Sequence, residues 1–168
     1  MLDRRLLQQL LPELVAFRQD LHAHPETAFA ERRTAARVAQ VLEQCGFEVH
    51  RGLARTAVIG TLSRGEGPAV GQRADMDALD LTETTALTYA SRQPGKMHAC
   101  GHDGHTTMLL GAARYLAQSR DFRGTVHFIF QPAEENLAGG RVMVEEGLFE
   151  RFPMQAVFGL HNWPGLEA

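Results

Sequence analysis

The sequence has 168 residues, enough for one compact domain with a hydrophobic core. Hydrophobic residues make up 44% and charged residues 22%, which is the balance of a soluble globular protein. A net charge of -3 without a basic stripe excludes nucleic acid and anionic membranes as expected partners. No apolar run predicts a transmembrane helix or a signal peptide. Cys45 and Cys100 are too few for a disulfide framework, so we expect a cytoplasmic protein.

Helices and apolar strands alternate along the chain. Apolar residues at helical spacing predict a helix over residues 3–23, which ends near Pro25 because proline restricts the residue before it. A second helix around residues 35–42 ends at Gly46. Strands are predicted over 47–50, 57–62, 69–73, 125–130 and 156–160, and further helices over 106–118 and 141–146. This order favours an α/β fold, a three-layer mixed sheet with helices on both faces.

Polar side chains follow three of the predicted strands. Asp75 and Asp77 follow one strand, Glu134 and Glu135 follow another, and His161 follows a third. In α/β proteins, binding and catalytic residues gather at strand ends and in the loops after them. We therefore expect these side chains to share one site.

The densest group of candidate ligands runs from His98 to His105 and includes Cys100, His102 and Asp103. Thiolate and imidazole are strong ligands for zinc-like ions, and Cys100 and His102 can reach one ion from a turn before the 106–118 helix. We expect Asp103 to accept a hydrogen bond from a ligand histidine and to fix its tautomer. The alternative is a structural cysteine beside surface histidines, and the two interpretations weigh about equally.

The acidic residues also allow more than one interpretation. Adjacent glutamates are ordinarily solvated, but at a strand end Glu134 and Glu135 can divide the work. One binds a metal ion and the other accepts a proton from the metal-bound water. Spacing alone favours Asp75 and Asp77 as turn formers over ligands or partners of a ligand histidine. A single histidine such as His161 is more often structural than a ligand.

Five segments together resemble the M20 metallopeptidase family. The resemblance is to its branch of hippurate hydrolases, bacterial N-acyl-amino-acid amidohydrolases and plant auxin-conjugate hydrolases. The segments occur in the family's order at 18–26 (RQDLHAHPE), 73–79 (RADMDAL), 98–109 (HACGHDGHTTML), 131–136 (QPAEEN) and 159–164 (GLHNWP). Each motif is weak by itself, but five linked motifs are a specific signal.

The resemblance implies roles for individual residues. Cys100, His102, Glu135 and His161 match the family's ligands for two divalent metal ions, which can be zinc, manganese, cobalt or nickel. Cys100 stands where other branches carry a bridging carboxylate, so a bridging thiolate is expected. Glu134 matches the general base that takes the proton of the attacking water.

Further residues are expected behind the ligands. Asp75 and Asp77 match a segment beside the family's site, and we place Asp103 and His105 with them, in contact with the ligands from behind. The implied reaction is hydrolysis of hippurate-like N-acyl amino acids to a carboxylate and a free amino acid. The expected partner is therefore a small molecule, not a nucleic acid or a membrane.

The resemblance extends only to part of the family's architecture. Residues 1–168 match the N-terminal part of the catalytic, metal-binding domain, so we expect an incomplete zinc-peptidase-like catalytic domain. Longer relatives carry a lid and dimerisation domain and a C-terminal part that supplies a last histidine ligand, and they are expected to be homo-oligomers. Two alternatives stay open: Cys100 as a nucleophile with a histidine as base, and an inactive truncated fragment with residual metal binding.

Overall fold

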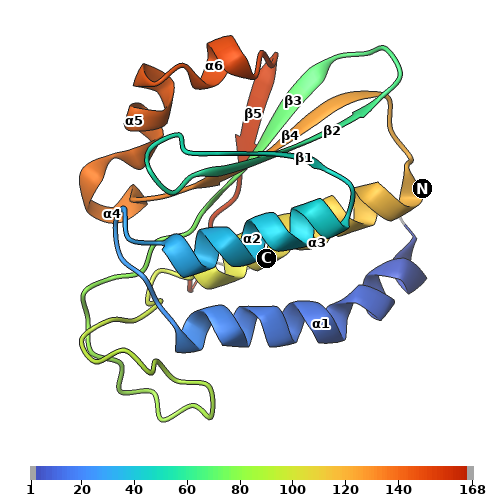
Figure 1. Ribbon diagram of the computed structural model, residues 1–168. Helices are drawn as coiled ribbons and strands as arrows, with labels where there is room; N and C mark the ends of the chain where they lie inside the picture. The colour runs from blue at the N-terminus through green and yellow to red at the C-terminus, as the bar shows by residue number, and fades with distance from the viewer. Residues whose placement is uncertain (1–2, 166–168) are drawn as a thin grey trace.

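The computed structural model describes residues 3–165. Its helices are α1 (Arg4–Ala23), α2 (Arg32–Gln44), α3 (His102–Ser119), α4 (Glu134–Leu137), α5 (Gly139–Glu145) and α6 (Leu148–Arg151) (Figure 1). Its strands are β1 (Glu48–Arg51), β2 (Val58–Arg64), β3 (Ala69–Asp75), β4 (Gly124–Gln131) and β5 (Ala156–Gly159). Every predicted element is present. No helix among the described residues is long and apolar enough to cross a membrane.

The helix α3 begins earlier than the sequence predicts. Gly101 adopts a φ of 90°, a left-handed conformation that glycine accepts readily, and the helix starts at the next residue. His102, Asp103 and His105 therefore stand on the first turns of a helix and not in a loop. Their side chains consequently point in directions set by the helical repeat.

The five described strands form one mixed sheet in the order β1-β2-β4-β3-β5. The pairs β1/β2 and β2/β4 are antiparallel, whereas β4/β3 and β3/β5 are parallel. The carboxyl ends of β3, β4 and β5 consequently meet at one edge of the sheet. The hydroxyl of Thr106, near the start of α3, donates to the carbonyl oxygen of Asp75 at the end of β3, so α3 also begins at this edge.

Side chains of β4 alternate between two hydrophobic cores on opposite faces of the sheet. Phe128 and Phe130 are buried in the core that includes residues of α1, α2 and α3. Ile129 points to the other face, where it packs with Met143 of α5 and Leu148 of α6. This alternation confirms the predicted α/β architecture with helices on both faces.

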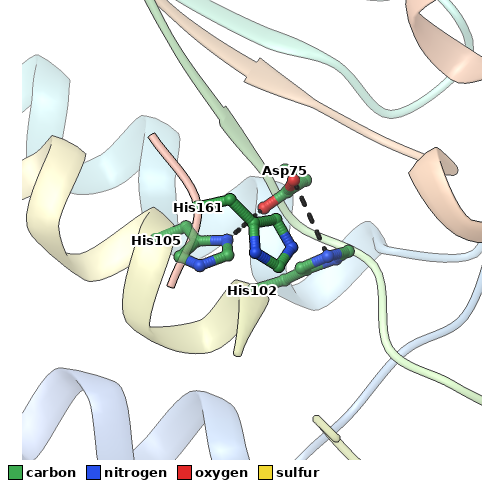
Figure 2. Close-up of side chains that lie close together, drawn as sticks. All are labelled: Asp75, His102, His105 and His161. Atoms are coloured by element: carbon green, nitrogen blue, oxygen red, sulfur yellow. Dashed lines mark hydrogen bonds and ion pairs between the residues drawn. The ribbon is translucent and has the colours of Figure 1, made fainter. Parts of the chain in front are cut away.

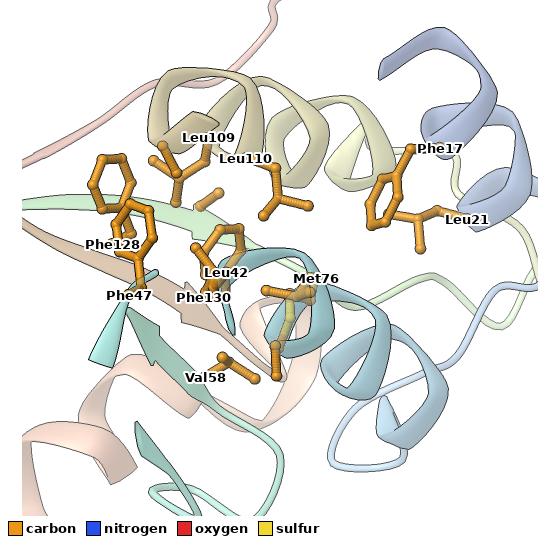
Figure 3. Packing of buried hydrophobic residues seen from close by; sticks show 14 of the residues in the cluster. Phe17, Leu21, Leu42, Phe47, Val58, Met76, Leu109, Leu110, Phe128 and Phe130 are labelled. Atoms are coloured by element: carbon orange, nitrogen blue, oxygen red, sulfur yellow. The ribbon is translucent and has the colours of Figure 1, made fainter. Parts of the chain in front are cut away.

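The helix α1 adds a further layer outside α3. Figure 3 shows Phe17 and Leu21 of α1 approaching α3, while Phe47 and Phe128 meet closer to the sheet. The rings of Phe47 and Phe128 lie edge to face, with centroids 5.3 Å apart. Burial of each such side chain stabilises the fold by about 1.5–3 kcal/mol. The core therefore holds α1 and α3 in fixed positions beside the site.

Candidate metal centre

The candidate site lies at the sheet edge where three parallel strands end and α3 begins. Asp75 ends β3, Glu134 and Glu135 open α4 directly after β4, and His161 follows β5. The first residue of α3, His102, faces them. The fold therefore gathers residues that are far apart along the chain, as the placement of polar residues after strands predicts.

The four residues expected as ligands approach one another closely. One ligand atom each from Cys100, His102 and Glu135 lie within 4.8 Å of one another. The Nε2 of His161 lies 3.3 Å from the Sγ of Cys100. The Nδ1 of His161 is 2.6 Å from the main-chain oxygen of Asn162, which can only accept a hydrogen bond. Nδ1 therefore donates this hydrogen bond, and Nε2 is the ring nitrogen that faces Cys100.

Two buried ligand atoms have no hydrogen-bond partner among the described residues. They are Nε2 of His102 and Oε1 of Glu135, and they lie 3.7 Å apart. The other nitrogen of His102, Nδ1, is 2.8 Å from the main-chain oxygen of Asp77 and 3.3 Å from its Oδ1. A buried polar atom without a partner costs about 1–3 kcal/mol. A cation between Nε2 and Oε1 removes that cost, so these residues fit a metal ion.

Negative charge surrounds the candidate ligands. Burial, followed by the neighbouring carboxylate of Glu135, raises the pKa of the Cys100 thiol to about 12. Burial by itself lowers the pKa of His102, but the hydrogen bond to Asp77 and the charge of Asp75 outweigh burial and raise it. Without a cation the site favours protonated ligands, and divalent ions would neutralise the charge that causes this.

A second set of neighbouring ligand atoms comes from Asp75, His102, His105 and His161 (Figure 2). In this set His105 already uses both ring nitrogens. Its Nδ1 lies 2.7 Å from Oδ1 of Asp75, and its Nε2 accepts a hydrogen bond from the main-chain N–H of Asn162 at 3.1 Å. No lone pair of His105 is free for a metal ion. The geometry therefore places His105 behind the ligands, between β3 and the segment that follows β5.

Asp75 and Asp77 orient the residues around them. Burial by itself raises the pKa of both carboxyls, but hydrogen bonds from His105 to Asp75 and from His102 to Asp77 outweigh burial and lower both values. The guanidinium of Arg73 lies 2.8 Å from Oδ2 of Asp75 and holds that carboxylate from the other side. Both aspartates are therefore charged partners of histidines, whereas spacing alone favours a role as turn formers.

Asp103 contacts residues of α1 and none of the four candidate ligands in the described hydrogen bonds. Its Oδ2 lies 2.7 Å from Nδ1 of His22 and 2.8 Å from Nε of Arg18, both on α1. One helix position separates Asp103 from His102, which turns the two side chains about 100° apart around α3. The residue that contacts the candidate ligand His102 is Asp77, through its main-chain oxygen.

Sequence reasoning missed a buried polar group behind Asp103. Nε2 of His22 lies 3.1 Å from Oε1 of Glu83, and the ring of His98 lies 6.4 Å from the ring of His22 between centroids. Burial lowers the pKa of His98 to about 4. The family motif at residues 18–26 includes His22. Spacing along α1 does not reveal which distant residues the His22 side chain contacts.

Comparison with known proteins assigns the chain to a family. The model of peptidase family M20/M25/M40 matches residues 71–168.

The chain belongs to this family.

Its curated relatives in the M20 family are hydrolases. A hippurate hydrolase from Campylobacter jejuni is 48% identical over 163 residues, which cover 92% of this chain and 42% of the relative. An N-acyl-L-amino acid amidohydrolase from Geobacillus stearothermophilus is 42% identical, with coverage of 98% and 45%. The chain therefore spans less than half the length of these curated relatives.

Solved M20 structures share the fold over nearly all of the chain. The YxeP protein of Bacillus subtilis, described as a dinuclear metal binding peptidase from the M20 family, is 42% identical with a TM-score of 0.87. The match covers 98% of this chain and 45% of that one. A putative aminohydrolase from methicillin-resistant Staphylococcus aureus gives a TM-score of 0.91 at 36% identity, covering 97% of this chain and 44% of that one.

Proposed function

We propose that this chain is the N-terminal part of the catalytic domain of a metal-dependent amidohydrolase. Its reaction is hydrolysis of the amide bond of hippurate-like N-acyl amino acids to a carboxylate and a free amino acid. The observation that carries the proposal is the convergence of Cys100, His102, Glu135 and His161 around two unpartnered buried ligand atoms. The names of the hippurate hydrolase and the N-acyl-L-amino acid amidohydrolase support the substrate class.

Two divalent metal ions complete the proposed site. Cys100, His102, Glu135 and His161 are the residues that would hold them, and thiolate and imidazole suit zinc, with manganese, cobalt or nickel as substitutes. The description of YxeP as dinuclear supports the number of ions. When bound, such ions polarise an amide carbonyl and lower the pKa of a water molecule.

Glu134 is the proposed general base. It is exposed at the start of α4, directly before Glu135, whose main-chain N–H bonds to Asp77. An exposed carboxylate beside the ligands can accept the proton of the attacking water and return it to the leaving amine. Asp77 and His105 keep the surrounding histidine and aspartate side chains in place.

The competing role of Cys100 as a nucleophile is disfavoured by its surroundings. An activated cysteine has a lowered pKa because cations or a helix N-terminus stabilise its thiolate. Burial and neighbouring carboxylates instead raise the pKa of Cys100 to about 12. A metal ion held by Cys100 would supply the positive charge that thiolate formation requires at this position.

The proposal extends to the location, the partner and the oligomeric state of the protein. Cys45 and Cys100 are both free thiols, which supports a reducing, cytoplasmic location. The proposed partner is a small N-acyl amino acid, and neither nucleic acid nor membrane takes part. The complete protein is proposed to carry the lid and dimerisation domain of longer M20 relatives and to form homo-oligomers.

Glu134→Gln tests the division of work between the two glutamates. In the complete protein, we expect metal content to stay unchanged while release of glycine from hippurate falls by about 10²–10⁴-fold, because the proton acceptor is lost. Elemental analysis and an amino-acid release assay measure the two quantities. Glu145→Gln, an exposed glutamate on α5, is the matched control.

The outcomes separate the candidate functions. Loss of metal together with turnover in Glu134→Gln would contradict the assigned general base. Metal uptake by the unaltered chain without hydrolysis of hippurate or acetyl-amino acids would support the alternative, an inactive truncated fragment with residual metal binding. This alternative is kept because the chain spans only 42% and 45% of the length of the two curated relatives.

A further inference from the structure

Glu31 is a fully buried carboxylate that the proposed chemistry does not use. It directly precedes α2, but its side chain makes no capping hydrogen bond to that helix. Instead Oε2 accepts a hydrogen bond from Oγ1 of Thr56 at 2.7 Å, and Oε1 accepts one from the main-chain N–H of Ala133 at 2.9 Å. Burial, and to a smaller extent the charge of Asp77, raises the pKa of Glu31. Burial of a carboxylate is unfavourable unless its hydrogen bonds offset the cost. One of the hydrogen bonds that Glu31 makes holds Ala133.

The residue that Glu31 holds has a strained backbone. Ala133 has φ 53° and ψ 45°, a left-handed conformation that residues with a Cβ seldom adopt. Its carbonyl oxygen accepts a hydrogen bond from the N–H of Gly139 at 2.9 Å. A Cβ at Gly139 would collide with the carbonyl oxygen of Pro132, so the turn closes tightly at that point. The surrounding contacts, and not alanine's own preference, impose this conformation.

Two buried carboxylates hold main-chain N–H groups on either side of Glu134. Glu31 binds the N–H of Ala133 at 2.9 Å, and Asp77 binds that of Glu135 at 3.0 Å. A left-handed residue followed by helical residues turns successive N–H groups to one side and so forms an anion-binding concavity. Here the anions are the protein's own carboxylates, and the segment they hold carries the proposed general base and a proposed ligand.

We infer that Glu31 is a positioning residue for the candidate metal centre, holding Ala133 in the left-handed conformation so that Glu134 and Glu135 face the site. The inference rests on the proposed function of those two glutamates. Without the Glu31 carboxylate, Ala133 relaxes to an ordinary backbone conformation and the segment after β4 rotates. Oε1 of Glu135 then leaves its place 3.7 Å from Nε2 of His102.

Co²⁺ titration of the chain and its variants tests the positioning role. We expect Glu31→Ala to weaken Co²⁺ binding about 10–100-fold, the usual effect of removing a residue that orients a metal ligand. The matched control is Glu26→Ala. Glu26 also accepts two main-chain N–H groups, from Arg33 at 3.0 Å and Thr34 at 2.8 Å, but both belong to α2. The control is expected to bind Co²⁺ as tightly as the wild type.

The conservative variant Glu31→Gln supplies a rescue. Its amide oxygen can accept from Ala133 and its amide N–H can donate to Thr56, so Co²⁺ affinity is expected to stay at the wild-type level. Unchanged affinity in Glu31→Ala, or an equal loss in Glu31→Ala and Glu26→Ala, would overturn the inference.

Hydrogen exchange at the amides of residues 133–135 gives a readout that does not depend on metal. We expect slow exchange in the wild type and in Glu26→Ala, and fast exchange in Glu31→Ala. If the wild type binds no Co²⁺, the metal-centre proposal fails, and the exchange pattern alone decides the role of Glu31. Equal exchange in all three proteins overturns that role.

A milder variant covers the case in which Glu31→Ala does not fold. Glu31→Asp keeps the charge but is one methylene too short to reach both Thr56 and Ala133. Faster exchange at residues 133–135 and weaker Co²⁺ binding are expected. Wild-type exchange and affinity in this variant would overturn the inference.

Discussion

Replacing Cys100 by serine is expected to reduce by one the number of protons released when the chain takes up metal. Burial and Glu135 raise the pKa of the thiol to about 12, so practically every Cys100 is protonated near neutral pH. Binding as a thiolate must displace that proton, whereas a serine hydroxyl keeps its own. The pKa of His102 is also raised, and any proton that this imidazole gives up on binding metal is given up in both proteins. Each proton released adds a slope of about one to the dependence of log affinity on pH, so this slope falls by about one in Cys100→Ser.

Calorimetric titration with Zn²⁺ in two buffers of different ionisation enthalpy counts these protons directly. Cys45→Ser is the matched control, because Cys45 is also a free cysteine with a pKa raised by burial but packs against the core away from the candidate site. The control is expected to release as many protons as the wild type. An equal proton count for Cys100→Ser and the wild type would refute thiolate ligation by Cys100.

Two further predictions concern stability. Phe128→Ala is expected to lower the free energy of unfolding by about 3–5 kcal/mol in urea denaturation, because the side chain is fully buried against Phe47. Phe158→Ala, at a side chain 55% exposed, should change it little, and similar losses in both would contradict the assigned core. The metal-free chain is also expected to lose stability as the pH falls below about 4, measured by unfolding at several pH values. The folded-state pKa values of Asp75 and Asp77 are lowered from 3.8. Their contribution to the free energy of unfolding is therefore fully present above the unfolded-state pKa and is lost as the pH falls through the folded-state pKa. A rise in stability on acidification would refute this prediction.

Most helices and strands were predictable because apolar periodicity is a local property of the sequence. The strand ends were predictable for the same reason, and they located Asp75, Glu134 and His161 at one edge of the sheet. The resemblance to the M20 family then supplied roles that spacing alone left open. Spacing had favoured Asp75 as a turn former, whereas the fold makes it the partner of His105.

Errors arose where side-chain direction mattered. The sequence places Asp103 among the candidate ligands and suggests that it accepts a hydrogen bond from a ligand histidine. The start of α3 at His102 turns Asp103 toward Arg18 and His22 instead. A shift of a helix boundary by one turn therefore changes which residues share a site, and boundaries are the least certain part of a prediction from periodicity.

By itself the sequence determined the order of the elements, the α/β class and the identity of the polar residues after each strand. These depend on spacing between neighbours, which local chemistry encodes. Only the tertiary structure decided which of those residues meet. The contact of Glu31 with Ala133 joins positions 102 residues apart, and the approach of His161 to Cys100 depends on the parallel order of β4, β3 and β5. Such contacts follow from the packing of whole elements, which no local pattern specifies.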